Sequence, residues 1–145
     1  MFDEMAIRKT IESDGKKNRG FLDFGTGDDL ENMPVARHVL VYMVICLNGS
    51  WKIPIAYYFV DGLSADERKN ITENILQKLP SINLPVISIT CDGHAHDINM
   101  AKKKMGASLE INDNFNTELK NPLSMTPLYF LLPLVLLKLV YCRLN

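Results

Sequence analysis

Residues 38–60 of the chain, HVLVYMVICLNGSWKIPIAYYFV, consist of two runs of β-forming residues on either side of an Asn-Gly pair. The arms at 38–47 and 51–60 are rich in β-branched and aromatic residues, which favour strands. Asn48-Gly49 favours a two-residue turn with positive φ. Pro54 cannot donate a ladder hydrogen bond, so we expect an edge segment or a bulge in the second arm. The pattern predicts an antiparallel hairpin.

The residues before this hairpin contain one further strand signal and two loops. Residues 1–11 alternate loosely between apolar and polar positions and predict a first strand. Residues 13–18 form a polar turn, and residues 20–25 a short extended segment. Residues 26–34 are acidic, contain further turn-forming residues and predict a loop.

The residues after the hairpin predict a helix with a defined start and end. Ser64 and Glu67 stand at the spacing of a capping box, with Ser64 as the N-cap. Apolar residues then recur at four-residue spacing on one helix face: Ile71, Ile75 and Leu79. Pro80 ends the helix because it cannot continue the backbone hydrogen bonding.

A short strand and a second helix follow. The apolar run at 86–91 is typical of a buried strand, and Asp92-Gly93 ends it. Residues 95–105 predict a helix with Gly106 as its C-cap. One face of that helix is apolar, with Ile98, Ala101 and Met105. Residues 112–121 are polar and predict a loop.

This order of elements predicts an α/β fold with a mixed sheet. An antiparallel meander is followed by a helical crossover, which is right-handed in nearly all proteins. The crossover can place the strand at 86–91 beside the first strand and parallel to it. Asp3 and Asp92 would then lie on neighbouring backbones about 4.8 Å apart. Two carboxylates so placed can share divalent metals about 3.5–4 Å apart, an arrangement suited to phosphoryl transfer.

Each of these aspartates also has a simpler interpretation. An Asp-Gly pair after a strand is more often a turn, and an aspartate near a chain start is more often solvated. Glu4 is expected on the face of the strand opposite Asp3. His94, His96 and Asp97 follow Asp92 closely and suggest zinc, but the two histidines lack the spacing of helical zinc ligands and no thiolate joins them. Lining the metal site is the better hypothesis for His94 or His96. Two further acids are interpreted as turn or surface residues, Asp23 and Asp61.

Composition fits one modest domain, because the chain has 145 residues of which 47% are hydrophobic. The formal net charge is −1, so bulk charge gives no support for nucleic-acid binding. The lysines at 102–104 form a short run, interpreted as a solvated helix face. The three cysteines are far apart in the sequence and predict reduced, intracellular thiols: Cys46, Cys91 and Cys142.

Five blocks of sequence, in order, resemble the P-element-type transposases and their THAP-domain transposase relatives. The blocks are FDEM at 2–5, GFLDFG at 20–25, GSWKIPIAYYF at 49–59, GLS at 62–64 and TCDG at 90–93. The tryptophan-containing block is long and specific. The resemblance covers residues 1–106 well and the remainder poorly. It implies an RNase H-like domain over residues 1–111, with its mixed sheet, flanking helices and a truncated end.

The resemblance also implies a function for the two aspartates. The first acid of the family's catalytic triad matches Asp3 and the second matches Asp92, as ligands of Mg²⁺ or Mn²⁺. The third is a glutamate beyond an inserted GTP-binding domain, and neither has a match here. The parent activity is metal-dependent DNA cleavage and strand transfer. The implied partners are transposon DNA and full-length transposase as a homo-oligomer, in the nucleus. We expect this chain to be inactive by itself.

Residues 112–145 diverge from the family and predict a hydrophobic tail. LYFLL at 128–132 resembles the family's next strand, and LKLV at 137–140 resembles a later segment at the start of the GTP-binding insertion. Between them PLVL replaces the family's acidic, cysteine and histidine residues, as in a decayed or mispredicted copy. The alternative functions are a non-enzymatic domesticated interaction fragment and, less favoured, a tail-anchored membrane protein. The apolar run at 127–142 is shorter than the about 20 residues of a membrane span and contains a lysine and a proline.

Overall fold

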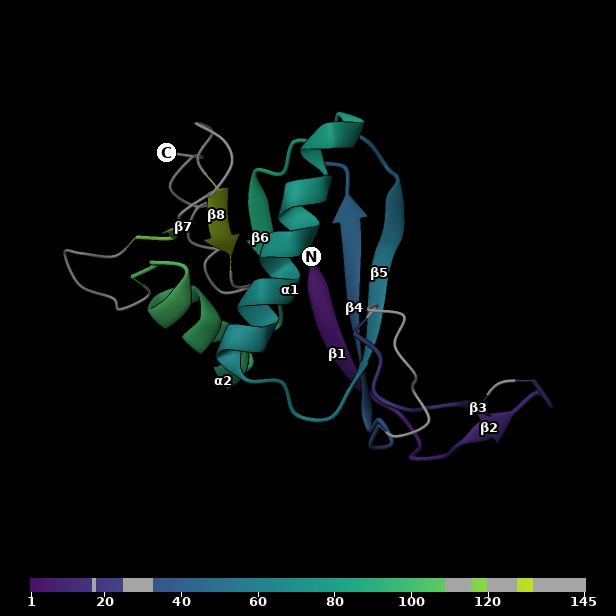
Figure 1. Ribbon diagram of the computed structural model, residues 1–145. Helices are drawn as coiled ribbons and strands as arrows, with labels where there is room; N and C mark the ends of the chain where they lie inside the picture. Colours follow the sequence, from purple (N-terminus) through teal and green to yellow (C-terminus); the bar gives the residue numbers. More distant parts are fainter. Residues whose placement is uncertain (17, 25–32, 109–115, 120–127, 132–145) are drawn as a thin grey trace. The chain divides into compact units, whose positions relative to one another are not determined.

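The computed structural model divides the chain into two compact units, Met1–Gly62 and Leu63–Asn145, each described by itself (Figure 1). The described residues are 1–16, 18–24, 33–108, 116–119 and 128–131. The division falls between the predicted hairpin and the predicted first helix.

The first unit contains a three-stranded antiparallel sheet in the order β1-β4-β5. Strand β1 spans Phe2–Ala6, β4 spans His38–Ile45 and β5 spans Lys52–Val60 (Figure 1). The predicted hairpin is confirmed as β4 and β5. The predicted first strand is also confirmed, although it occupies only the first half of residues 1–11.

The turn of this hairpin differs from the prediction. In the described loop neither Asn48 nor Gly49 has a positive φ. The Cys46 amide donates to the Trp51 carbonyl at 3.1 Å, which leaves the four residues 47–50 in the loop. Loops of this length are usually built around a type I turn, which needs no positive φ at its central positions. Glycine is favoured at 49 by close approach instead, because a Cβ there would lie 3.1 Å from the Cys46 sulfur.

The expected irregularity at Pro54 is confirmed as a bulge in an edge strand. Tyr42 pairs with Ala56, but the next residue, Met43, pairs with Pro54. Ile55 is therefore the extra residue of β5, which lies at the edge of its sheet. The bulge and the edge position together accommodate a residue without a backbone donor.

The two faces of this sheet differ in burial. On one face the side chains of Phe2, Leu40 and Tyr42 are buried, and the Phe2 and Tyr42 rings lie 5.2 Å apart between centroids. The other face carries Asp3 and Tyr57, which are exposed. Side chains alternate between faces along a strand. The pairing of Asp3 with Val41, and of Val41 with Tyr57, therefore places these three residues on the face opposite Phe2 and Tyr42.

A second, smaller hairpin precedes β4. Strands β2 (Glu12–Ser13) and β3 (Asn18–Arg19) pair antiparallel and confirm the turn expected at 13–18. The extended segment at 20–25 is confirmed by two isolated bridges, Phe21 with Val35 and Asp23 with Phe59. The predicted acidic loop at 26–34 lies mostly outside the described residues.

Helix α1 opens the second unit and spans Ala65–Lys78. The predicted capping box is confirmed in both directions. The Glu67 amide donates to the Ser64 hydroxyl oxygen at 3.3 Å, and the Ser64 amide donates to the Glu67 carboxylate at 2.8 Å. The helix ends before Pro80, which begins the short 3₁₀ segment η2, Pro80–Ile82.

The buried face of α1 was predicted wrongly except at Leu79, which is buried. The other buried residues of the helix are Arg68, Thr72 and Leu76. Ile71 and Ile75 are half-buried and border this row. Two of the buried residues are polar, and Thr72 satisfies its buried hydroxyl by donating to the Arg68 carbonyl at 2.7 Å.

Strand β6 and helix α2 follow, as predicted, but both are shorter than expected. Strand β6 spans Ser88–Thr90 and α2 spans Ala95–Asn99. The chain continues from α2 as a π-helix, η3, over Met100–Lys104, in which the Met105 amide donates to the Met100 carbonyl at 3.0 Å. Gly106 follows with a φ of 86°, which confirms it as a C-cap glycine.

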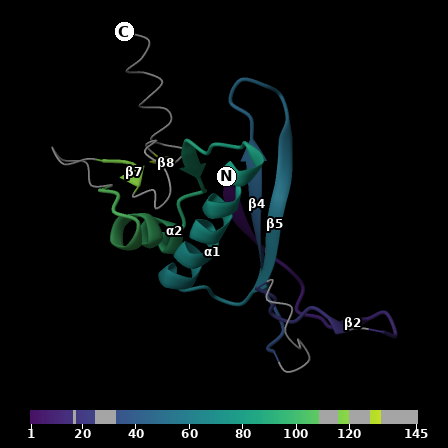
Figure 2. The ribbon, with the colours of Figure 1, turned by 45° about the horizontal axis from the view of Figure 1, so that its top comes forward.

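Strand β6 belongs to a second three-stranded sheet, in the order β6-β8-β7 (Figure 1; β7 and β8 are also labelled in Figure 2). Strand β8, Leu128–Leu131, is parallel to β6 and antiparallel to β7, Glu118–Leu119. This sheet is mixed, which agrees with the predicted mixed α/β class. It is not the sheet that the sequence predicts, in which the strand at 86–91 lies beside the first strand. The segment at 128–132, which resembles the family's next strand, is confirmed as β8. The loop predicted at 112–121 is wrong at Glu118–Leu119, which form strand β7.

Two predictions stay open, one because it joins the two units and one because most of its residues lie outside the described ranges. The expected pairing of the strand at 86–91 with the first strand joins the two units and stays a prediction. Most of the apolar run at 127–142 lies outside the described residues. Within the residues that are described, every helix is too short or too polar to cross a bilayer.

The capping box gives a direct test of the second unit. We expect Ser64→Ala to lower the free energy of unfolding by about 1 kcal/mol, because the first turn of α1 loses the side-chain acceptor of an N-terminal amide. Urea unfolding followed by circular dichroism measures the change. Ser50→Ala, in the β4–β5 loop, is the control. Equal stabilities of the two variants would contradict the role of the cap.

Candidate functional site

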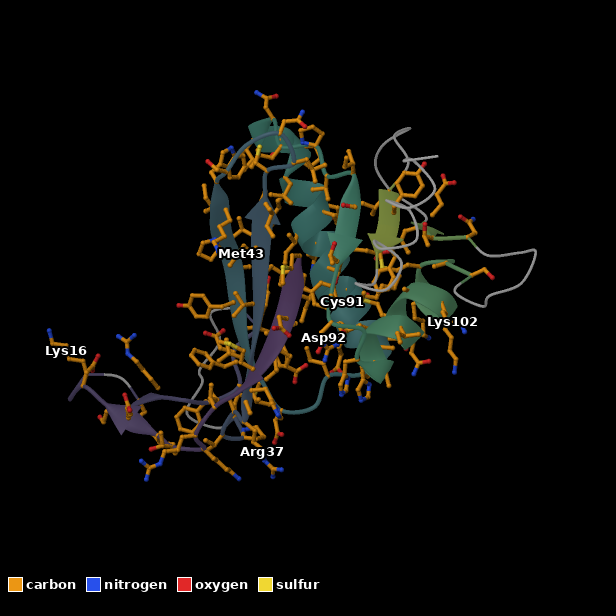
Figure 3. The ribbon with its side chains drawn as sticks, turned by 180° about the vertical axis from the view of Figure 1, so that it is seen from behind. Lys16, Arg37, Met43, Cys91, Asp92 and Lys102 are labelled. Carbon is orange, nitrogen blue, oxygen red and sulfur yellow. The ribbon has the colours of Figure 1, made fainter. Side chains whose placement is uncertain are left out.

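Asp92 lies two residues after the end of strand β6, where the chain turns toward α2 (Figure 3). Its side chain is exposed, and its Oδ1 accepts a hydrogen bond from the His94 amide at 3.0 Å. This is an Asx turn, in which an aspartate replaces a backbone acceptor. Gly93 has a φ of 88°, a conformation that glycine adopts without strain. Local chemistry therefore favours this turn and directs one carboxylate oxygen toward the His94 amide.

Two further side chains gather around Asp92. The Cys91 sulfur and one carboxylate oxygen each from Asp92 and Asp97 all lie within 4.8 Å of one another. Cys91 and Asp97 are buried, whereas Asp92 is exposed. Sequence reasoning identified Asp92 but assigned no role to Asp97.

The Cys91 thiol is a weak metal ligand in this environment. Burial raises its pKa to about 12, and the negative charges of Asp97 and Asp92 contribute to the rise. A hydrogen bond from the Gly93 backbone and the Arg68 charge act in the opposite direction but are outweighed. Because the thiolate is the form that binds metals, Cys91 stays a small hydrophobic residue at neutral pH.

Asp97 forms an ion pair with Arg68 inside the second unit. The Arg68 Nη1 and Asp97 Oδ1 atoms lie 3.0 Å apart, and the side chains are only 3% and 4% exposed. Arg68 belongs to α1 and Asp97 to the first turn of α2. The charge of Asp97 is therefore compensated by Arg68, and the exposed carboxylate of the cluster is that of Asp92. Arg68, Thr72 and Leu76 recur at four-residue spacing, but two of them are polar, so the spacing alone did not indicate that this row is buried.

His94 and His96 stack on each other at the start of α2. Their ring centroids lie 5.3 Å apart with the rings 16° from parallel, and both side chains are exposed. Neither belongs to the three-residue cluster of potential metal ligands found among the described residues. The hypothesis that they line a metal site stays a prediction.

Asp3 lies in strand β1 of the first unit, opposite Val41 of β4. Its side chain is exposed, and its Oδ1 accepts from the Glu4 amide at 2.8 Å. Glu4 approaches His38 instead, with 3.6 Å between its Oε1 and the His38 Nδ1. The predicted opposite orientation of Asp3 and Glu4 is consistent with these contacts. Because Asp3 and Asp92 belong to different units, their pairing stays a prediction.

The remaining acids have ordinary structural roles. Asp61 follows β5 and lies 3.4 Å from Arg37, measured between carboxylate oxygen and Nε. The Asp23 amide donates to the Phe59 carbonyl at 2.9 Å. The interpretation as a turn or surface position agrees for Asp61, whereas Asp23 is half-buried in an antiparallel bridge with Phe59. Lys104 reaches Asp66 at 2.8 Å, so part of the lysine run takes part in a surface ion pair.

The donor atoms around Asp92 suit a hard divalent cation better than zinc. The exposed group is a carboxylate, the neighbouring thiol is protonated, and the second carboxylate is paired with arginine. Oxygen ligands of this kind favour Mg²⁺ or Mn²⁺, whereas structural zinc sites use thiolates and imidazoles.

Comparison with known proteins identifies relatives of this chain. Residues 1–105 match the family described as TNP-like, RNase H N-terminal domain. The human DNA transposase THAP9 is 30% identical over 101 residues, which cover 68% of this chain and 11% of that protein. The structure of the Drosophila P element transposase strand transfer complex superposes with a TM-score of 0.65 and 21% identity. It covers 98% of this chain, which spans 28% of the P element chain.

The raised pKa of Cys91 predicts slow alkylation. At a pKa of about 12, roughly one Cys91 thiol in ten thousand is ionised at pH 8, and its burial restricts access further. We expect iodoacetamide to modify Cys46 at least roughly a hundredfold faster than Cys91 in the folded Cys142→Ser chain. Peptide mass spectrometry measures both rates, with the urea-unfolded chain as the control. Similar rates in the folded chain would contradict the burial of Cys91.

Proposed function

Because the chain belongs to the TNP-like RNase H N-terminal domain family, within the P-element-type transposases, we propose that it supplies two metal-binding carboxylates of a DNA transposase catalytic domain. The observation that carries the proposal is the exposed Asp92 carboxylate, oriented by an Asx turn at the end of β6. The fold is RNase H-like, with a mixed α/β architecture. The chain covers only part of its relatives, so the activity of a whole transposase is part of the proposal.

We assign Asp3 and Asp92 as the residues that would hold Mg²⁺ or Mn²⁺. Both are exposed carboxylates, and each has one oxygen oriented by a nearby backbone amide. When bound, the metal supplies Lewis-acid activation of a hydroxyl nucleophile and stabilises the leaving oxygen of a phosphodiester. The contribution of this chain is to present the two carboxylates from a rigid sheet and a short turn. Transposon DNA is the proposed substrate, and the nucleus the proposed location.

For this chain by itself, metal binding is the property to measure. The family resemblance assigns the third acid to a glutamate that none of these 145 residues matches. Loss of a ligand removes both affinity and control of transition-state charge. We therefore propose that the chain binds metal weakly and does not cleave DNA alone.

Replacement of both carboxylates should abolish specific metal binding. We expect Asp3→Asn plus Asp92→Asn to weaken Mn²⁺ binding at least roughly tenfold, because hard-cation affinity depends on the number of charged oxygen ligands. Electron paramagnetic resonance of free Mn²⁺ measures the affinity of the full chain. Asp61→Asn plus Asp66→Asn removes the same charge from two surface positions and is the matched control.

The single variants then test whether the two aspartates share one site. If they do, Asp3→Asn and Asp92→Asn will each cost nearly as much affinity as the double variant, since residues of one site are not additive. Equal binding by the wild-type chain and the double variant would refute the metal assignment. That result would instead favour a non-enzymatic interaction fragment.

A further inference from the structure

We propose that the buried Arg68–Asp97 ion pair is a positioning device for Asp92. It fixes the turn that carries the Asp92 carboxylate and compensates the charge of the neighbouring Asp97. The significance of this role for metal binding rests on the proposed function, but the ordering of the turn does not. Arg68 and Asp97 are positioning residues, since neither is assigned to touch metal or DNA.

A continuous set of contacts connects Arg68 to Asp92. Arg68 lies near the start of α1, where its amide donates to the Ser64 carbonyl at 3.0 Å. Its guanidinium holds the Asp97 carboxylate at 3.0 Å. The Asp97 amide donates to the His94 carbonyl at 2.9 Å, and the His94 amide donates to the Asp92 Oδ1 at 3.0 Å. The first turn of α2 therefore connects the buried pair to the exposed carboxylate.

Helix α2 needs such a tertiary contact because it is short. It spans Ala95–Asn99 and continues only as the π-helix η3 to Lys104, and its N-cap residue, His94, makes no side-chain capping hydrogen bond. Helices of this length are not stable in isolation and depend on tertiary packing. Asp97 is the buried residue of α2, and its partner lies on a longer helix that has its own capping box. The ion pair thus connects the short helix to the longer, capped one.

The ion pair also sets the charge around Asp92. Asp97 and Asp92 place carboxylate oxygens within 4.8 Å of each other. The Arg68 guanidinium, 3.0 Å from Asp97, compensates the buried one of these two charges. Asp92 accepts one hydrogen bond through Oδ1, and a carboxylate has about four lone-pair sites. The turn therefore orients this carboxylate and still leaves it capacity for a cation.

The test removes both charges together. Arg68→Met plus Asp97→Leu avoids an uncompensated buried charge, and such replacements are often tolerated by the fold. The control is Asp66→Asn plus Lys104→Gln, which removes a surface ion pair between α1 and η3, the segment that continues α2. Two variants with smaller changes, Arg68→Lys and Asp97→Asn, provide the test if the double variant does not fold.

In the full chain without metal, we expect the ¹⁵N order parameters of Gly93 and His94 to fall from about 0.85 to below about 0.6 in the charge-free double variant. The Ile89 amide in β6 should keep its value, as should all three amides in the control. Arg68→Lys should keep part of the order at 93 and 94, because the lysine still places a positive charge opposite Asp97. Asp97→Asn should lose this order, because it removes the negative partner of Arg68. Unchanged order at 93 and 94 in a folded double variant or in Asp97→Asn overturns the proposal.

Mn²⁺ titration of the same variants separates this proposal from the metal assignment. We expect the double variant to bind Mn²⁺ roughly tenfold more weakly than the control, the scale typical of residues that orient metal ligands. If the turn loosens but the wild-type chain binds no Mn²⁺ through Asp92, the positioning role stands and the metal assignment fails. If the wild-type chain binds Mn²⁺ and the folded double variant binds it equally, the positioning role fails alone.

Discussion

Arg68 and Asp97 bring opposite charges into the interior of the second unit, where neither would be tolerated without the other. Removal of one partner from a buried pair typically costs about 3–5 kcal/mol, because the remaining charge stays out of water without compensation. The two side chains come from different helices, and both are almost completely buried. Helices α1 and α2 must therefore keep their relative position, and the turn between β6 and α2 is fixed with them.

This constraint explains how the candidate site combines rigidity with exposure. Strand β6 is held in a mixed sheet by β8, and the chain leaves it through Cys91, which is buried. The next residue, Asp92, is exposed and oriented by an Asx turn. A carboxylate needs both properties to bind a metal, since exposure gives the cation access and a fixed geometry limits the entropy lost on binding. Asp3 has similar surroundings in the first unit, exposed on β1 beside the β4–β5 hairpin.

Local features of the sequence were predicted best. The β4–β5 hairpin, the bulge at Pro54 and the Ser64 capping box each depend on a few neighbouring residues. The turn at Asn48-Gly49 was wrong because strand register, set over the whole hairpin, left a longer loop. The buried face of α1 was wrong for a similar reason. Periodicity favours apolar residues, and it cannot anticipate that a distant carboxylate will compensate a buried arginine such as Arg68.

The sequence by itself determined most of the elements, their order and the family resemblance, because these follow from propensity, capping chemistry and short motifs. It also identified Asp3 and Asp92 as candidate ligands through the motifs that contain them. Only the tertiary structure revealed the role of Asp97, which lies 29 residues from Arg68 in sequence but 3.0 Å from it in space. The physical reason is that burial decides the meaning of a charge. From the sequence alone, an aspartate in a polar stretch is expected at the surface. In the folded unit, packing buries Asp97, and Arg68 from another helix compensates its charge.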